Sequence, residues 1–171
     1  MNIILKNLKL LEQKCKKIKL VLTDVDGVLT DGGMYYSEHG EIMKKFNTRD
    51  GMGVELLSKQ KIKTIIITRE NSKIVKSRGK KIKVFKTYVG VLHKELVLDD
   101  ICKKLSLTSN NIAYVGDDIN DYEIMKRCGL ACSPNNCIKK IKSISDYVCE
   151  NNGGDGVLRE VADLILSFHT N

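Results

Sequence analysis

IKLVLTDVDGVLT, residues 18–30, begins with an apolar run, which is followed by two aspartates and a glycine. The apolar part, Ile18 to Thr23, predicts a buried strand, and Asp24 and Asp26 follow where it ends. Residues two apart in a strand point the same way, so the two carboxylates would repel each other and resist burial. A bound cation, or a reaction that needs both groups, would resolve that conflict, and Gly27 would allow a sharp turn. The alternative for this stretch alone is a strand that ends in a polar turn.

A second acidic cluster follows another strand-like run. Residues 111–115 (NIAYV) predict a strand, and the next six residues are Gly116-Asp117-Asp118-Ile119-Asn120-Asp121. In an open α/β sheet, sites form outside the carboxyl ends of the strands, so two acidic ends side by side would build an oxygen-rich site. Such hard ligands suit Mg²⁺. We therefore expect a magnesium site between these two strand ends.

Two further polar residues lie between the acidic clusters. The run Thr64–Thr68 predicts a third strand that ends in a hydroxyl, and Lys94 follows a fourth segment, Tyr88–Val91. Taken singly, Thr68 is interpreted as a strand-end hydroxyl and Lys94 as a surface charge. In this order, however, the aspartates, the hydroxyl, the lysine and the acidic metal site resemble the haloacid dehalogenase superfamily of phosphotransferases. The order of motifs covers Asp24 to Asp121.

The resemblance implies a catalytic role for four residues. Asp24 would be the nucleophile, since carboxylates form aspartyl-phosphate intermediates. Asp26 would protonate the leaving alcohol and then deprotonate the water that hydrolyses the intermediate. Thr68 would hydrogen-bond a phosphoryl oxygen, and Lys94 would stabilise the negative charge on Asp24 and on the phosphoryl group.

The resemblance also implies a set of ligands for Mg²⁺. Asp24, the backbone carbonyl of Asp26, and Asp117 would bind the ion, while Asp118 and Asp121 would orient Asp117 and the motif lysine.

The superfamily commonly has Gly after the motif threonine and often Asp before the motif lysine, whereas this chain has Arg69 and His93 there. Neither departure removes a reacting group.

The rest of the chain alternates strands with helices, which predicts a Rossmann-like, doubly wound α/β fold with a parallel sheet covered on both faces. A β-hairpin flap is expected over Gly33–Ser37 and Glu41–Asn47. Both slots in which this superfamily often inserts a cap domain are short, so the resemblance implies an enzyme with no cap domain. The expected helices are Met1–Lys17, Gly51–Lys59, Ser72–Lys80, Lys94–Leu105, Asp118–Cys128 and Val157–Ser167, and the expected strands are Ile18–Thr23, Lys63–Thr68, Val84–Tyr88, Asn111–Val115, Leu130–Cys132 and Tyr147–Val148.

The composition bounds the class of protein. A chain of 171 residues with 42% hydrophobic residues is long enough for one domain, 1–171, with a sizeable core. No apolar run approaches the roughly 20 residues that span a bilayer, and the N-terminus lacks a signal-peptide pattern. We therefore expect a cytoplasmic protein with no membrane partner. The six cysteines contain no CxxC pair and are expected to be reduced thiols, mostly in the core.

The net charge of +8 has three interpretations. Nucleic-acid binding is one, but aromatic residues make up only 5% and no tryptophan is present to stack on bases, so we expect no nucleic-acid partner. A solvated, lysine-rich surface is the second, and attraction of a small anionic substrate is the third.

A nonenzymatic receiver domain that accepts phosphate on aspartate is a further alternative to the phosphatase. Its acidic pair normally precedes the phosphorylated residue, whereas Asp-x-Asp comes first in this chain.

Finer motifs narrow the resemblance. Residues 24–33 (DVDGVLTDGG), 46–51 (FNTRDG), 116–121 (GDDIND) and 153–160 (GGDGVLRE) look like the 3-deoxy-D-manno-octulosonate 8-phosphate (KDO 8-phosphate) phosphatase family. This similarity runs from about Ile18 to Leu166. It implies a magnesium-dependent sugar-acid phosphatase of the capless, homotetrameric kind, in which a neighbouring chain closes each active site.

The segment Gly153–Arg159 would, by this resemblance, reach the active site of a neighbouring chain. The alternative is a flexible connector to a docking helix. Arg49, Arg78 and Arg159 are the candidates for binding substrate anions, because Arg binds carboxylate and phosphate through two parallel hydrogen bonds.

Two signals conflict on the sugar acid. Enzymes for the eight-carbon acid tend to carry Gly-Arg after the motif threonine, whereas relatives acting on nine-carbon acids tend to carry Glu there and Lys eleven residues on. This chain has Glu70 and Lys81 at those positions, yet Arg49-Asp50-Gly51 look like the eight-carbon branch. We expect KDO 8-phosphate as the substrate. The alternative is the nine-carbon homologue, 2-keto-3-deoxy-nononate or N-acylneuraminate 9-phosphate, so the product would feed lipopolysaccharide or a sialic-acid-like surface sugar.

Overall fold

The computed structural model describes residues 3–169 and contains a six-stranded sheet in the order β5-β4-β1-β6-β7-β8. Every pair of neighbouring strands in this sheet is parallel. Thr23 of β1 lies opposite Ile66 of β4 and Val115 of β6, so the three central strands end at the same edge. The strands are β1 (Leu20–Thr23), β4 (Lys63–Ile67), β5 (Lys86–Tyr88), β6 (Ile112–Val115), β7 (Leu130–Ser133) and β8 (Tyr147–Val148).

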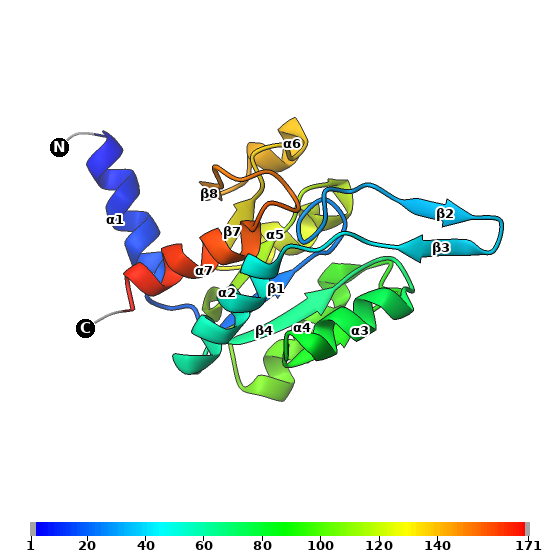
Figure 1. Cartoon of the computed structure of the whole chain (residues 1–171). Helices are drawn as coiled ribbons and strands as arrows, with labels where there is room; N and C mark the ends of the chain where they lie inside the picture. Colours follow the sequence, from blue (N-terminus) through cyan, green and yellow to red (C-terminus); the bar gives the residue numbers. More distant parts are fainter. Residues whose placement is uncertain (1–2, 170–171) are drawn as a thin grey trace.

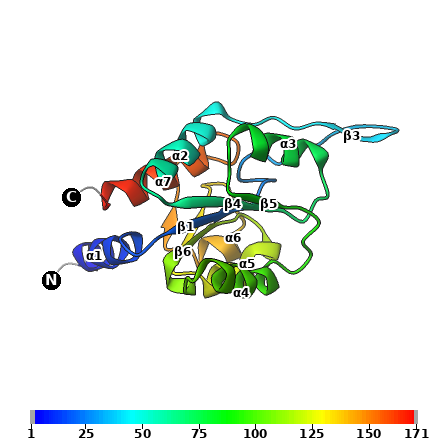
Figure 2. The same ribbon diagram turned by 90° about the horizontal axis from the view of Figure 1, so that it is seen from below.

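Helices cover both faces of the sheet, as Figure 2 shows. One face carries α2 (Thr48–Lys59), α3 (Lys73–Lys81) and α7 (Val157–Ser167). The other carries α4 (Lys94–Leu105), α5 (Tyr122–Arg127) and α6 (Lys139–Lys142). The first helix, α1 (Ile3–Cys15), contacts α7 at the end of the molecule where both termini lie (Figure 1). The predicted doubly wound α/β fold is thereby confirmed.

The strands alternate their side chains between two hydrophobic layers. Val21 and Val115 pack into the layer under α2 and α7, whereas Leu20, Leu22 and Tyr114 pack into the layer under α4 and α5. Strands buried on both faces have nearly continuous apolar sequences. This is the physical reason that short apolar runs located these strands correctly.

Between β1 and β4 the described chain inserts α2 and a short antiparallel hairpin, β2 (Tyr35–Ser37) and β3 (Gly40–Met43). The hairpin projects away from the sheet (Figure 1). Between β4 and α4 only α3 and β5 are found within residues 3–169, so the described chain has a flap and no cap domain, as predicted.

The start of α2 differs from the prediction for a local reason. The helix begins at Thr48 rather than at Gly51. The side chain of Asn47 accepts a 3.0 Å hydrogen bond from the backbone N–H of Arg49 and so caps the helix one turn earlier. This earlier start places Arg49 on the first turn of a rigid element.

The first helix, the lack of a membrane-spanning helix among the described residues and the state of the cysteines can each be compared with the prediction. The helix expected over Met1–Lys17 is found as α1, and Met1 and Asn2 lie outside the described residues. None of the helices in residues 3–169 is long and apolar enough to cross a bilayer. All six cysteines are free thiols, of which Cys15, Cys132 and Cys149 are buried and the other three are half-buried.

Candidate active site

The acidic strand ends meet at one edge of the sheet. Asp24 directly follows β1, Thr68 directly follows β4, and Asp117 lies just beyond β6. A cavity of about 240 Å³ opens between them, and the residues that line it are Asp24, Asp26, Thr68, Arg69, Glu70, Asp117, Asp118, Ile119 and Asn120. The structure therefore brings together both acidic clusters and the threonine, which are far apart in the sequence.

Lys94 reaches this cluster from the first turn of α4. Its side chain is fully buried, and its Nζ lies 2.8 Å from Oδ2 of Asp24 and 2.7 Å from Oδ1 of Asp121. Burial alone would lower the pKa of Lys94, but the two facing carboxylates raise this pKa above its ordinary value. The ammonium therefore stays charged and offsets part of the negative charge of the cluster.

Asp121 holds three groups of the site in place. Its Oδ1 accepts hydrogen bonds of 2.7 Å from Nζ of Lys94 and from the hydroxyl of Tyr114, and its Oδ2 accepts one of 3.0 Å from the backbone N–H of Asp117. Two of these contacts are with Lys94 and the backbone of Asp117, the residues that Asp121 was expected to orient, and that role stays a prediction. Tyr114, which the sequence analysis did not single out, lies on the β6 run that predicted the strand, and its apolar neighbours conceal its polar role.

Asp118 makes different contacts from those expected. Its carboxylate accepts a 2.7 Å hydrogen bond from the backbone N–H of Ile119 and caps a short 3-10 turn, Ile119–Asp121, which replaces the first turn of the helix expected over 118–128. Among the described residues, Asp118 has no hydrogen bond to the carboxylate of Asp117 or to Lys94. Its charge acts on Asp117 only through space, where it raises the pKa of that group.

The arrangement around Asp117 fits a small divalent cation. Oδ1 of Asp117 is buried and has no hydrogen-bond partner among the described residues. Burial, followed by the charges of Asp121 and Asp118, raises the pKa of Asp117 to about 7. A side chain at Gly27 would place its Cβ 2.0 Å from Oδ2 of Asp117, so only glycine leaves room for this carboxylate. A hard cation bound here would satisfy the unpaired oxygen and the excess negative charge.

Carboxylate oxygens of Asp24, Asp117 and Asp121 all lie within 4.8 Å of one another. The two oxygens of Asp121 already accept hydrogen bonds, so Asp24 and Asp117 are the side chains that would hold a metal ion. Asp24 and Asp117 are two of the three predicted ligands, and their role stays a prediction. The backbone carbonyl of Asp26 stays a prediction.

A buried lysine from the hairpin was missed by the sequence analysis. Nζ of Lys44 lies 2.5 Å from Oδ1 of Asp26 and 2.7 Å from Oε1 of Glu41. The chain contains 29 lysines and arginines, and nothing in the local sequence separates Lys44 from the exposed Lys45 beside it. Burial of one and exposure of the other is decided by contacts between distant segments.

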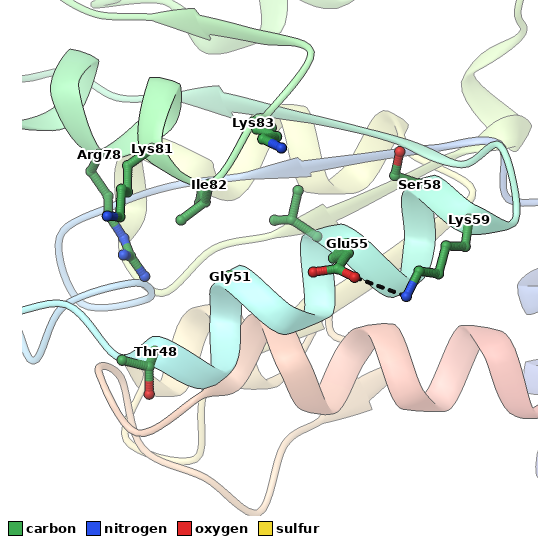
Figure 3. A pocket seen from close by; sticks show the side chains of 10 residues that line it. Thr48, Gly51, Glu55, Ser58, Lys59, Arg78, Lys81, Ile82 and Lys83 are labelled. Atoms are coloured by element: carbon green, nitrogen blue, oxygen red, sulfur yellow. Dashed lines mark ion pairs between the residues drawn. The ribbon is translucent and has the colours of Figure 1, made fainter.

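The five residues expected to bind substrate do not share one cavity. Glu70 lines the catalytic cavity beside Thr68. Arg78 and Lys81 instead line a larger cavity, of about 670 Å³, between α2 and α3 (Figure 3). The guanidinium of Arg78 donates a 2.6 Å hydrogen bond to the carbonyl of Asn47 and lies over the ring of Phe46, so it also joins α3 to the start of α2.

Arg49 and Arg159 lie together in a third cavity, of about 300 Å³, between the start of α2 and the start of α7. Nε of Arg159 donates to both carboxylate oxygens of Asp163, at 2.9 and 2.8 Å. No described cavity contains these two arginines together with Asp24. Arg49 and Arg159 therefore line a cavity separate from the one that Asp24 lines.

The glycine-rich segment before α7 packs on its own chain. The backbone N–H of Gly154 donates a 3.0 Å hydrogen bond to the carbonyl of Val28, and a Cβ at Gly153 would lie 2.0 Å from the carbonyl oxygen of Gly27. The first part of Gly153–Arg159 therefore supports the loop that follows Asp26, a contact that the sequence analysis did not foresee.

Comparisons with known proteins identify the family of this chain. A family model for haloacid dehalogenase-like hydrolases matches residues 55–161. The 3-deoxy-D-manno-octulosonate 8-phosphate phosphatase KdsC of Escherichia coli is 37% identical over 153 residues, which cover 90% of this chain and 81% of that protein. The cobalt-bound deoxy-D-mannose-octulosonate 8-phosphate phosphatase of Haemophilus influenzae aligns with a TM-score of 0.88 at 35% identity and covers 91% of both chains.

A third relative was solved with ligands bound. The 3-deoxy-D-manno-octulosonate 8-phosphate phosphatase of Moraxella catarrhalis, in complex with magnesium, phosphate and KDO, aligns with a TM-score of 0.89 at 35% identity. The alignment covers 92% of this chain and 91% of that structure. Since the family match spans more than half of the chain and the relatives match nearly all of it, the chain belongs to the haloacid dehalogenase-like hydrolases.

Proposed function

We propose that this chain is a magnesium-dependent phosphoric monoester hydrolase that acts on a 3-deoxy-2-ulosonate phosphate, with KDO 8-phosphate as the substrate. The observation that carries the proposal is the buried ion cluster of Asp24, Lys94 and Asp121 beside the unpaired oxygen of Asp117. Similarity to KDO 8-phosphate phosphatases over 90% of the chain supports the choice of substrate.

The first chemical step would form an aspartyl-phosphate. Lys94 holds Oδ2 of Asp24, so Oδ1 of Asp24 is the oxygen that would attack phosphorus. As the new O–P bond forms, the bond between phosphorus and the sugar oxygen breaks, and its electron pair stays on the sugar oxygen. Asp26, which lines the same cavity, would donate a proton to that oxygen.

The second step would release phosphate. Asp26, now deprotonated, would take a proton from a water molecule whose oxygen attacks phosphorus, and the Asp24–phosphorus bond would break to restore the carboxylate. Lys94 and the hydroxyl of Thr68 would stabilise the charge on the oxygens of the phosphoryl group. Mg²⁺ held by Asp24, Asp117 and the Asp26 carbonyl would supply further neutralisation of those oxygens.

A nine-carbon sugar-acid phosphate is the second candidate substrate. Glu70 lines the catalytic cavity, directly after Thr68 and Arg69, which supports the proposal that it contacts the sugar. Glu70 and Lys81 are the residues that relatives acting on nine-carbon acids tend to carry. The observation that favours this candidate is therefore the position of Glu70 rather than any difference in the catalytic groups.

Side-by-side kinetics test the proposal and separate the two substrates. We expect Mg²⁺-dependent phosphate release over many turnovers, with kcat/KM for KDO 8-phosphate higher than for 2-keto-3-deoxy-nononate 9-phosphate by roughly tenfold or more. Chelation with EDTA should abolish turnover and added Mg²⁺ should restore it, because the carboxylates of the cluster would lose their cation. Glu70→Gln serves as the matched variant, since it keeps the shape of the side chain.

The other outcomes are equally informative. A reversed preference that Glu70→Gln weakens would make the nine-carbon acid the substrate. A single phosphorylation event without turnover would point to a phospho-acceptor domain. Salt-sensitive binding of generic DNA or RNA, with no hydrolysis, would point to a nucleic-acid-binding protein.

We also propose that the active enzyme is a homotetramer in which Arg159 of the Gly153–Arg159 segment serves a neighbouring active site. The catalytic cavity of one chain, about 240 Å³, is smaller than the roughly 300–1,000 Å³ of most ligand pockets. The arginines that would bind substrate anions line other cavities of the same chain. A neighbouring chain would supply what one chain does not assemble.

Mixed oligomers test this arrangement. Asp24→Asn and Arg159→Ala chains should each be nearly inactive alone, whereas co-expressed chains should recover about a quarter of the wild-type activity if chains mix at random in a closed oligomer. The matched control is a mixture of Asp24→Asn chains with Thr68→Val chains. Each of these changes damages the site of the chain that carries it, so the two chains should not complement each other. Absence of recovery in the first mixture would show that Arg159 does not act across chains.

A further inference from the structure

Lys44 is a buried cation that belongs to the hairpin rather than to the sheet. It directly follows β3, and its side chain has no exposed area. Its Nζ lies 2.5 Å from Oδ1 of Asp26 and 2.7 Å from Oε1 of Glu41. By contrast, the side chain of Lys45 is 64% exposed and pairs with Asp31 at 3.4 Å. A lysine is rarely buried to this degree unless its charge is paired, and Lys44 is paired twice.

The second partner of Lys44 ties it to α3. Oε2 of Glu41 accepts a 2.6 Å hydrogen bond from Oγ of Ser72. Oγ of Ser72 in turn accepts a 3.4 Å hydrogen bond from the backbone N–H of Val75 and caps the N-terminus of α3. A continuous chain of polar contacts therefore runs from α3 through the hairpin to the carboxylate of Asp26.

Both side-chain hydrogen bonds to Asp26 fall on the same oxygen. Oδ1 accepts from Lys44 and, at 3.4 Å, from the hydroxyl of Thr30, whereas Oδ2 accepts none from the described residues. The side chain of Asp26 is 26% exposed and lines the catalytic cavity. Lys44 therefore holds one oxygen of Asp26, and the other has no hydrogen bond from a side chain of the described residues.

We propose that Lys44 is a positioning residue that holds the carboxylate of Asp26 toward the oxygen of the leaving alcohol, with Glu41 and Ser72 anchoring Lys44 in turn. The inference rests on the proposed phosphatase function. Because its side chain is fully buried, Lys44 acts through Asp26 and not by touching the substrate. The hairpin thereby contributes to proton transfer.

The leaving group provides a readout that a purely structural role would not move. A sugar alkoxide needs a proton from Asp26 as it leaves, whereas p-nitrophenolate leaves readily without one. We expect Lys44→Met to slow single-turnover release of the sugar alcohol from KDO 8-phosphate by roughly 10- to 100-fold. Single-turnover release of p-nitrophenol from p-nitrophenyl phosphate should change by less than about threefold.

Three further variants sharpen the test. Lys45→Met, on the exposed neighbour, should match wild type for both substrates. Lys44→Arg, which keeps the charge and the donors, should recover part of the lost rate. Lys44→Met should add nothing further in an Asp26→Asn background, because the group that it positions is already absent.

If Lys44→Met proves too unstable to assay, Glu41→Gln provides a milder change. It keeps the contact between Lys44 and Asp26 but weakens the anchor behind it, so a smaller slowing confined to the sugar phosphate is expected. Equal slowing of both substrates in either variant, or additivity with Asp26→Asn, would overturn the role of Lys44 while leaving the phosphatase function intact. Failure of the wild-type protein to hydrolyse either phosphate would overturn both.

Discussion

Asp24→Asn should reduce kcat for phosphate release by roughly 10⁴-fold or more, because an amide cannot act as the nucleophile and no other carboxylate of the cavity lies in its place. The substitution preserves the size of the side chain. It also removes one of two carboxylates that share the single ammonium of Lys94. Burial and the charge of Asp121 raise the pKa of Asp24 well above its ordinary value, which shows that the folded protein disfavours this charge.

Stability should therefore move in the opposite direction to activity. In the presence of EDTA we expect the free energy of unfolding of Asp24→Asn to equal or exceed that of the wild type, measured by urea denaturation. Asp99→Asn is the matched control, because Asp99 is a 70% exposed carboxylate on α4 whose surface ion pair with Arg127 contributes little, so both quantities should change little. Retention of near-wild-type turnover by Asp24→Asn would disprove the assignment of the nucleophile.

Lys94→Met should have the second-largest effect, and it should act on stability and activity together. The change leaves Asp24 and Asp121 facing each other without their cation, and breaking a buried ion pair costs about 3–5 kcal/mol. We expect kcat to fall by roughly 10²- to 10³-fold, since a positive charge is lost where negative charge develops on the phosphoryl group. Urea denaturation without metal and phosphate release with Mg²⁺ measure the two effects.

The stability defect of Lys94→Met should grow with pH. Without the ammonium, the buried carboxylates bind protons more tightly in the folded state than in the unfolded state, so the free energy of unfolding falls as pH rises through the range in which they ionise. The difference from wild type should therefore be larger near pH 8 than near pH 5. The double variant Lys94→Met/Asp121→Asn should regain part of the stability but none of the activity. A defect that is independent of pH would show that lost packing, not charge, causes it.

Much of the candidate site could be predicted because its parts are encoded locally. Asp24 and Asp117 each follow an apolar run, and such runs become strands buried on both faces of a parallel sheet. Parallel strands end at a common edge, so the order of strand ends along the chain predicts which side chains meet there. Thr68 and Lys94 were singled out differently, because only the order of motifs, and not either residue by itself, resembled the haloacid dehalogenase superfamily.

Other features could not be predicted because distant segments decide them. Two helix boundaries differ from the prediction because of side-chain caps: Asn47 caps α2, and Asp118 caps a 3-10 turn. The sequence does not show which of these side chains caps a helix and which faces solvent or a ligand. Arg78 and Lys81 were grouped with Glu70 from sequence alone, yet the packing of α3 against α2 turns them into a separate cavity.

The amino-acid sequence alone was enough to predict the order and burial of the strands, and with them the position of the aspartates and the threonine that line the catalytic cavity. Tertiary structure alone decided what surrounds them. Lys44 and Lys45 are identical neighbours in the sequence, but only Lys44 meets the carboxylates of Asp26 and Glu41. Desolvation of a charge costs free energy, and this cost is offset only where opposite charges from other segments face the buried group, which happens only in the folded chain.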